Sequence, residues 1–416
     1  MTTRTSSRRR LAGLALVATL TVAACGSDSD DTPAAGSTSE STSESTPADT
    51  AGETPDAPAS DGALPAGEYT IGFASLTSGP AAFAGVPLSQ GANLAVQEAN
   101  DAGLLGEGVT LKMVEEDAGG DAAKAIGIVE GFLNDDVSAV LCCALSSVAG
   151  SVKPILASAE TAGIVTSAIL PDLPELPYMY RTVLLLGDPA YTEMVTGLNA
   201  DGAFSSAVIV VTADNDGMTN EGVFWEEAFG ANDISVNETI DTATGDTDFS
   251  GPATQIVEEN PDIVALSMLG QEATLLAKAL RDRGYEGQMV TTYGISNAAN
   301  YEIGGETLDG IIFPIAFTPQ MESDAAKAFT ALYEAEYGEV PDVFAAQGYV
   351  AVKFVMEGLA AAGTGDHAAV AAALAEIDMM DSPYGSMSFE GGQADLAGET
   401  TFMQWNADGT QSLWVP

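Results

Sequence analysis

Two adjacent serines follow an apolar run and precede a helical pattern. Ser146 and Ser147 come directly after residues 137–145, which predict a buried strand, and at the start of a helix expected over 148–161. The start of a helix carries unpaired backbone N–H groups and the positive end of the helix dipole. A ligand carboxylate fits such a position, with the serine hydroxyls as further donors. The alternative is that one serine only caps the helix.

Patterns for catalysis or metal binding are missing from the sequence. His367 is the single histidine and begins an Ala-rich helical stretch, so a Ser-His-Asp site would have to use it. No Gly-x-Ser-x-Gly or Ser-x-x-Lys pattern occurs, and no cluster of His and Cys is present. Asp214-x-Asp216-Gly217 lacks the Glu that completes an EF-hand loop. We therefore expect no enzyme activity, no bound metal and no cofactor.

The N-terminus combines a basic start with a short apolar run. Four arginines between residues 4 and 10 precede apolar and small residues over 11–24, which end at Cys25. This order is typical of an export signal, and the run is too short to span a bilayer core of about 30 Å. A cysteine there resembles the lipobox of bacterial lipoproteins, which implies diacylation of Cys25; an ordinary signal with an incidental cysteine is the alternative. Two acyl chains would anchor the protein to the extracytoplasmic face of the cell membrane.

Composition separates a linker from a folded body. Residues 25–66 contain no aromatic residue, Lys or Arg and are rich in Ser, Thr, Pro and acids, so we expect a disordered spacer. The chain of 416 residues has 60 acidic and 13 basic residues, a net charge of −47. Nucleic acid and anionic lipid both need a basic surface, so this charge argues against them as partners. The rest of the chain is long enough for two lobes.

Beyond the linker, β-rich runs alternate with helical patterns. The expected strands are 70–76, 109–115, 137–145, 164–168, 207–211, 234–240, 263–268, 288–293 and 310–317. The expected helices are 87–100, 121–133, 148–161, 221–229, 252–259, 272–283, 323–337, 344–362 and 367–377, with short strands over 384–415. The strand runs are continuously apolar, as in parallel strands covered on both faces. Two βαβ series predict an α/β fold with two doubly wound lobes.

Motifs in three parts of the chain occur in a recognisable order. The first part is IGFASLTSGPAAFAG at 71–85, followed by 91–100. The second is ALSS at 144–147 with AGI at 162–164, and the third is DFS at 248–250, NPDIV at 260–264 and RDRGY at 281–285. Together these motifs resemble the solute-binding proteins of the leucine/isoleucine/valine type, which feed ABC importers. The resemblance covers essentially all of 68–416.

The resemblance implies a type I periplasmic-binding-protein fold. Two doubly wound parallel-sheet lobes are joined by a three-crossing hinge, and ligand sits between them at the carboxyl ends of the strands. Closure of this bilobal clamp about the hinge is the expected motion. The expected parts are a signal peptide 1–24, the linker 25–66, lobe one 68–185 plus 318–380, and lobe two 186–317 plus 381–416.

The resemblance also implies ligand contacts in lobe one. Ser146 and Ser147 would hold the ligand, and Ser167 follows the next strand, where the family also contacts ligand. Phe83 stands where the family often has an aromatic residue over the ligand; a core phenylalanine is the alternative.

Lobe two departs from the pattern of the amino-acid binders in this family. Those proteins hold the ligand ammonium with a carboxylate after the fourth strand of lobe two, where this chain has Tyr293. The Tyr293 ring could face an ammonium as a cation–π partner. Asp214, Asp216 or Glu272 could supply the acid from another direction, although a solvated loop charge is the alternative for each.

Cys142 and Cys143 are the only cysteines besides Cys25. They lie in an apolar run, and neighbours in sequence rarely form a disulfide because the geometry strains the backbone. We interpret them as small buried hydrophobic residues.

These observations predict capture of a ligand without chemistry. We expect a monomeric solute-binding lipoprotein of an ABC importer, which takes a small amino-acid-like ligand and delivers it to the permease and ATPase subunits. Two alternatives stay open: a sensor lipoprotein for a membrane receptor, and an importer component for an amide, a carboxylate or an aromatic acid.

Overall fold

The first of two sheets is built mainly from the N-terminal half of the chain. The computed structural model describes residues 64–184, 187–396 and 400–416; the predicted signal peptide, Cys25 and most of the linker lie outside them. The strands run in the order β11-β12-β13-β5-β4-β3-β1-β2. Their bounds are β1 Gly67–Ser75, β2 Val109–Asp117, β3 Val140–Cys142, β4 Gly163–Val165, β5 Met179–Arg181, β11 Met379–Ser382, β12 Gly385–Glu390 and β13 Gln393–Leu396. Strands β1 to β5 pair in parallel, which confirms a doubly wound lobe.

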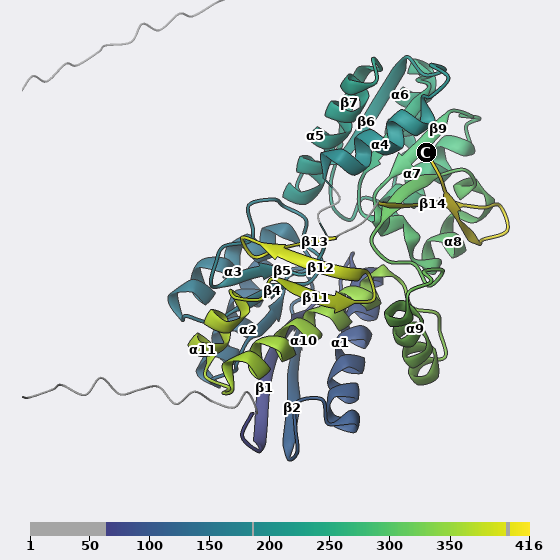
Figure 1. Ribbon diagram of the computed structural model, residues 1–416. Coiled ribbons are helices and arrows are strands. Elements are labelled where there is room, and N and C mark those ends of the chain that lie inside the picture. The colour runs from purple at the N-terminus through teal and green to yellow at the C-terminus, as the bar shows by residue number, and fades with distance from the viewer. Residues whose placement is uncertain (1–63, 185–186, 397–399) are drawn as a thin grey trace, which may run out of the picture. The chain divides into compact units, whose positions relative to one another are not determined.

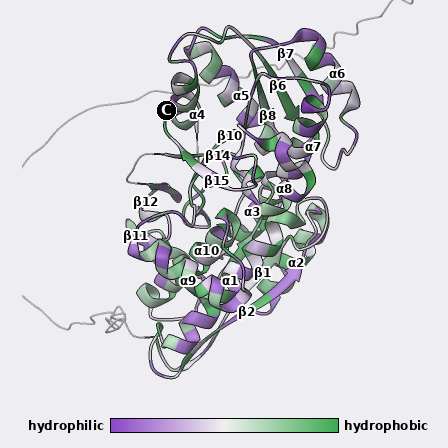
Figure 2. Ribbon diagram, turned by 90° about the vertical axis from the view of Figure 1, so that its right-hand side faces the viewer, coloured by the Kyte–Doolittle hydropathy of each residue, from purple (hydrophilic) through white to green (hydrophobic). Residues whose placement is uncertain are grey.

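The second sheet has the same construction. Its strands run in the order β15-β14-β10-β9-β8-β6-β7, and β6 to β10 pair in parallel. Their bounds are β6 Ser206–Thr212, β7 Ser235–Thr242, β8 Ile263–Ser267, β9 Gln288–Thr291, β10 Ile312–Ile315, β14 Thr401–Trp405 and β15 Gln411–Trp414. Every residue of β8 is buried, as expected of a central strand. In Figure 2 the central strands β6 and β8 are green, whereas the edge strand β2 carries hydrophilic purple.

Helices cover both sheets. Those that belong with the first sheet are α1 Ala82–Ala102, α2 Ala122–Asn134, α3 Ser146–Ser158, α9 Asp324–Tyr337, α10 Val343–Ala362 and α11 His367–Leu374. Those of the second sheet are α4 Asp188–Leu198, α5 Asp216–Ala231, α6 Ser250–Glu259, α7 Gly270–Arg281 and α8 Ala298–Gly304, with the short 3₁₀ helices η1 Tyr293–Ser296 and η2 Gly305–Leu308. The expected pattern contained neither α4 nor α8.

The chain passes between the sheets three times, after β5, after β10 and after β13. This confirms the three-crossing architecture. The expectation that all of 381–416 joins lobe two is wrong, because β11 to β13 extend the first sheet through the pairing of β13 with β5. Only β14 and β15 pair within the second sheet. In Figure 1, the yellow strands β11 to β13 lie beside β5, whereas β14 lies among the elements of the other lobe.

Helices α1 and α10 form the main helix pair of lobe one. A Cβ on Gly91 would lie 1.8 Å from the Ala345 carbonyl oxygen, and a Cβ on Gly348 would lie 1.9 Å from that of Leu88. Glycine at both positions therefore lets the two backbones touch. Helix α10 is long and apolar enough to cross a membrane, but 83% of its most apolar window is buried inside the protein, as in a core helix.

Candidate functional site

A cleft lies where the carboxyl ends of strands from both sheets meet. It holds about 560 Å³ of space not occupied by atoms, part of which is open to solvent. The walls are largely apolar. The lining residues are Leu76, Ala81, Phe83, Ala84, Ala144, Leu145, Ser146, Ser167, Ala168, Ile169 and Phe344 from lobe one, and Asn215, Met218, Met268, Leu269, Gly270, Thr292, Tyr293 and Gly294 from lobe two.

Helix α3 begins at the wall of this cleft without a cap. Its N-cap residue, Leu145, offers no side-chain acceptor, and the first turn contains no acid. The carbonyl oxygen of Leu145 accepts from Ala149, but the N–H groups of Ser146, Ser147 and Val148 find no acceptor within the described chain. Three donors and the positive end of the helix dipole are thus available at this end of α3.

The two predicted serines differ in their positions. Ser146 is 3% exposed and lines the cleft, and its Oγ accepts a hydrogen bond of 3.2 Å from the N–H of Leu170. Ser147 is exposed and does not line the cleft, although its carbonyl oxygen accepts from Ser151 within α3. The side chain of Ser146, rather than that of Ser147, is therefore placed to contact a ligand.

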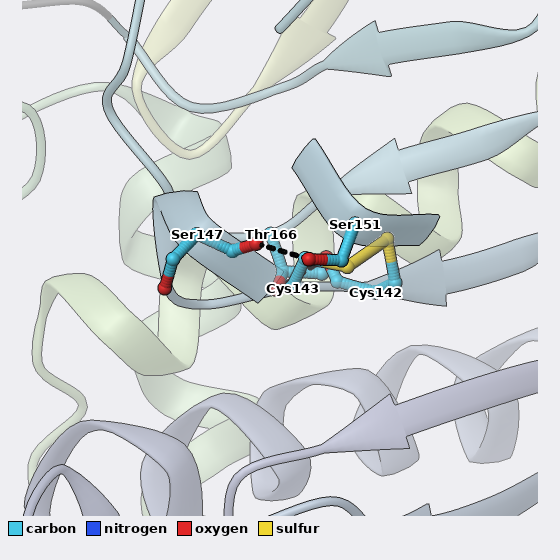
Figure 3. The surroundings of a disulfide bond; sticks show 5 residues. All are labelled: Cys142, Cys143, Ser147, Ser151 and Thr166. Carbon is cyan, nitrogen blue, oxygen red and sulfur yellow. Dashed lines mark hydrogen bonds between the residues drawn. A yellow bond between two sulfur atoms is a disulfide. The ribbon is translucent and has the colours of Figure 1, made fainter. Parts of the chain in front are cut away.

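Cys142 and Cys143 are buried as expected, but the expectation that these neighbouring cysteines do not pair is wrong. The two residues form a disulfide, and both are buried. Strand β3 ends at Cys142, three residues before the expected end at Leu145. The chain turns away from the strand at Cys143, which has a φ of +77°. Figure 3 shows the disulfide with Thr166 and the first turn of α3 around it.

Thr166 connects the disulfide to the next strand. Its N–H and its Oγ1 both donate to the carbonyl oxygen of Cys142, at 3.0 and 3.1 Å. Ser167, a predicted ligand contact, follows directly and lines the cleft. The segments that begin at Ala144 and at Ser167 are therefore both anchored on the same disulfide-bonded pair.

Asp117 holds the loop that leads to Phe83. Its carboxylate accepts from the N–H of Thr77 at 2.8 Å, from the N–H and Oγ of Ser78, and from the N–H of Gly119. Desolvation by burial opposes ionisation, but these hydrogen bonds outweigh it and lower the pKa of Asp117 below its ordinary value. Phe83 lines the cleft at the start of α1, and its ring packs edge-on against Phe344 with centroids 5.9 Å apart.

Tyr293 bridges the two lobes. It lies in η1 directly after β9, and its hydroxyl donates to the carbonyl oxygen of Ser167 at 3.2 Å. Its ring centroid is 5.7 Å from that of Phe344 on α10. The Tyr293 side chain thus lines the cleft, and its hydroxyl donates a hydrogen bond within the protein.

The lobe-two wall is set by the start of α5. Asn215 caps this helix by accepting from the N–H groups of Gly217 and Met218. A Cβ on Gly217 would lie 2.8 Å from the Oγ of Ser146 and 3.1 Å from Cγ1 of Ile169, both in lobe one. The lobes are in contact at this point, and the glycine permits it.

None of the predicted acids lines the cleft within the described chain. The carboxylate of Glu272 accepts from Thr212 at 3.1 Å and from the N–H of Gly245 at 2.6 Å, and burial raises its pKa. Asp214 is exposed and accepts from the N–H and Oγ1 of Thr244, and Asp216 is exposed. We conclude that these three acids do not supply a negative charge to the cleft.

Glu221 is a buried acid that the sequence reasoning missed. It lies one helical turn beyond Met218, is 1% exposed and accepts from the Tyr191 hydroxyl. Its Oε2 has no partner among the described residues. Burial raises the pKa of Glu221 to about 8, against the opposing hydrogen bond from Tyr191. The carboxyl group is therefore mostly neutral at pH 7 and lies behind the wall.

The single histidine lies away from the cleft. His367 lies on α11, and its Nδ1 is 3.3 Å from a carboxylate oxygen of Asp136, which lies in the loop before β3. Neither residue lines the cleft. No group of three or more His, Cys, Asp or Glu side chains that could hold a metal occurs in the described ranges.

Several lining residues had no signal in the sequence. Asn215 before an expected helix has the form of a cap, which could have placed the helix start earlier. Met218, Met268 and Phe344 read as core residues, since apolar side chains at a cleft and in a core follow the same pattern.

Comparison with known proteins identifies similar chains. Residues 68–410 match the family described as periplasmic binding protein. The chain is 28% identical over 349 residues to the Leu/Ile/Val-binding protein BraC3 of Rhizobium johnstonii, covering 82% of this chain and 92% of that protein.

Solved structures share the fold. The substrate-binding protein LivJ of Streptococcus pneumoniae, in complex with isoleucine, superposes with a TM-score of 0.75 at 23% identity, over 84% of this chain and 100% of that one. A solute-binding protein of an ABC transporter from R. palustris, in complex with benzoate, gives a TM-score of 0.73 at 21% identity, over 83% of this chain and 95% of that one.

Proposed function

The chain belongs to the periplasmic binding protein family, of the branched-chain amino acid ABC transporter type, and on this premise we propose that it captures a small carboxylate-bearing ligand between its lobes for an importer. Proteins of this type are extracytoplasmic and bind solutes rather than transform them. The ligand would bind one lobe, the lobes would close, and the closed form would dock on the permease, which works with an ATPase subunit. The binding protein would act as a monomer.

The observation that carries this proposal is the uncapped start of α3. Ser146, the first residue of this helix, is buried and lines a cleft whose walls are largely apolar. A carboxylate would accept several hydrogen bonds there, and charge-assisted hydrogen bonds are the stronger kind. The apolar body of the ligand would lie against Phe83, Phe344 and Met218.

Two ligand classes fit this description. Relatives named for leucine, isoleucine and valine support an amino-acid-like ligand, and the apolar, acid-free lining supports an acid without an amine. Both would place their carboxylate at α3.

A matched pair of variants tests the carboxylate site. The protein is the chain without its first 25 residues, which retains every residue that the structure describes. Ser146→Ala removes the cleft-lining hydroxyl and should weaken binding about 5-fold to 10-fold, because one hydrogen bond contributes about 1 kcal/mol. Ser147→Ala changes the exposed neighbour and should leave binding unchanged.

Titration calorimetry with leucine, isoleucine, valine and their deaminated acids gives the affinities. Equal effects of the two variants would contradict the placement of the carboxylate at Ser146. Failure of the whole panel to bind would contradict the proposed function.

We also propose that diacylated Cys25 tethers the protein to the cell membrane. The sequence context of Cys25 supports this, and a labelled fatty acid fed to the producing cells should appear in the protein. Cys25→Ser should abolish the label and release the protein from the membrane fraction; a protein that stays bound without Cys25 would refute the tether.

A further inference from the structure

Helix α3 offers unpaired hydrogen-bond donors beside the cleft. At α3 the N–H groups of Ser146, Ser147 and Val148 have no partner in the described chain. By contrast, α5 is capped by Asn215 and has Asp216 in its first turn. Of these three residues only Ser146 lines the cleft, so the positive end of the α3 dipole meets the cleft at Ser146, in lobe one.

Several polar acceptors of the lining residues are already in use. Each accepts a hydrogen bond from another protein group, at 3.0–3.3 Å. The carbonyl oxygen of Ser167 accepts from Tyr293, and that of Gly294 accepts from Asn300. The Ser146 hydroxyl accepts from the N–H of Leu170, and the Thr292 hydroxyl accepts from the N–H of Gly294. The side-chain oxygen of Asn215 accepts from the N–H groups of Gly217 and Met218. A ligand donor in the cleft would have to share these oxygens.

Negative charge is missing from the same surface. No carboxylate belongs to the described lining. Glu272 is engaged with Thr212 and Gly245, and Glu221 lies behind Met218 with its carboxyl bonded by Tyr191. A ligand ammonium would be desolvated here without an anionic partner, which is a costly arrangement.

Tyr293 contributes to the apolar wall of the cleft. Its hydroxyl is held by the Ser167 carbonyl oxygen of the opposite lobe, and its ring packs on Phe344. With Phe83 on the other side of Phe344, three aromatic rings form a continuous apolar wall. A flat or branched hydrocarbon body fits such a wall without any polar partner.

From this pattern of donors, acceptors and charge, we infer that the cleft takes an apolar monocarboxylate that carries no ammonium group. The inference rests on the proposed solute-binding function and specifies its ligand class. Branched-chain acids without the amine and simple aryl acids share this chemistry. The carboxylate binds at α3, and the body lies on the wall formed by Phe83, Phe344 and Tyr293.

Matched pairs of compounds test the inference. Titration calorimetry on the wild-type chain compares leucine with 4-methylpentanoate and 4-methyl-2-oxopentanoate, and phenylalanine with 3-phenylpropanoate, with benzoate as a further acid. We expect at least one acid to bind at least about 100-fold more tightly than its amino-acid partner, because the ammonium has no anionic partner. Leucine binding as tightly as its deaminated acids would overturn the inference while upholding the proposed function. If no compound binds, both fail.

Glu221 provides a second, independent measurement. If the buried carboxyl accepted a ligand ammonium after rearrangement, Glu221→Gln would lower leucine affinity relative to the acids. We expect Glu221→Gln to leave the order of affinities and the acid affinity within about twofold of the wild type. Selective loss of leucine binding in Glu221→Gln would show that an ammonium site exists and would overturn the inference.

Discussion

Replacing Gly217 by alanine should hold the lobes apart without damaging either lobe. The new Cβ would lie 2.8 Å from the Oγ of Ser146 and 3.1 Å from Cγ1 of Ile169, and both atoms belong to lobe one. Gly217 itself lies in the first turn of α5 in lobe two, and its φ is not in the left-handed region. The helix backbone therefore accommodates alanine. The two shortest contacts of the added methyl group are across the lobes, and the third, 3.2 Å to Oδ1 of Asn215, lies within lobe two and requires only a small shift of that side chain.

The size of the effect follows from these distances. Contacts this short require a shift of the neighbours, and an inserted methyl group in a packed interface costs about 1–3 kcal/mol. The cost applies to the closed form alone, so the apparent Kd for the ligand should rise about 5-fold to 150-fold. The free energy of unfolding without ligand should change little, because an open form relieves the clash.

Gly230→Ala is the matched control. It lies on the same helix, and a Cβ there would meet nothing within 4 Å. Gly230 lies in the last turn of α5 without a positive φ, so alanine there should stabilise the fold by about 0.4–1 kcal/mol and leave affinity unchanged.

Titration calorimetry with the acid that binds the wild type most tightly gives the affinities, and thermal denaturation without ligand gives the stabilities. Wild-type affinity in Gly217→Ala would refute the idea that this lobe contact belongs to the ligand-bound form. A large loss of unliganded stability would show that the methyl group damages lobe two itself.

Three further predictions concern the surroundings of the cleft. The pKa of Glu221 is raised from 4.5 to about 8 in the fold, so its contribution to stability is complete below pH 4.5 and is lost as pH rises towards 8. Glu221→Gln should therefore reduce the fall in Tm between pH 5 and pH 8. An unchanged fall would contradict the raised pKa of Glu221. The double variant Cys142→Ala with Cys143→Gly removes the disulfide but keeps a residue suited to the φ of +77° at position 143. It should bind ligand more tightly than Cys142→Ala with Cys143→Ala, because a left-handed backbone costs alanine about 1 kcal/mol. Equal affinities of the two double variants in calorimetry would show that this turn does not position α3. Tyr293→Phe removes the hydrogen bond to Ser167 and should weaken binding about 2-fold to 10-fold with little change in unliganded Tm, whereas a tighter complex would show that the bond does not hold the lobes together.

The alternation of strands and helices could be predicted because it is written locally. Central strands such as β8 at Ile263–Ser267 are buried on both faces and read as continuous apolar runs. Helix α4 at Asp188–Leu198 and helix α8 at Ala298–Gly304 were missed, since short helices give weak periodic signals. Strand β3 ended three residues earlier than expected because Cys143 adopts a positive φ.

The C-terminal region shows a second limit of the sequence. Short strands are expected over 384–415 and are present in the structure. Their division between the two sheets could not be predicted. Strand β13 joins β5, and β14 joins β10, through pairings between segments far apart in the chain. Local patterns carry no information about such partners.

The sequence by itself determined that Ser146 starts a helix at the end of a buried strand, and hence that an anion could be bound there. It did not determine that Ser146 faces the cleft while Ser147 is exposed, because successive helical residues point about 100° apart and packing sets the rotation. Tertiary structure alone decided that Tyr293 reaches Ser167 across the lobes, and that Glu221 and Glu272 stay out of the lining. These relations depend on how the two lobes meet, and no single stretch of sequence contains both sides of that contact.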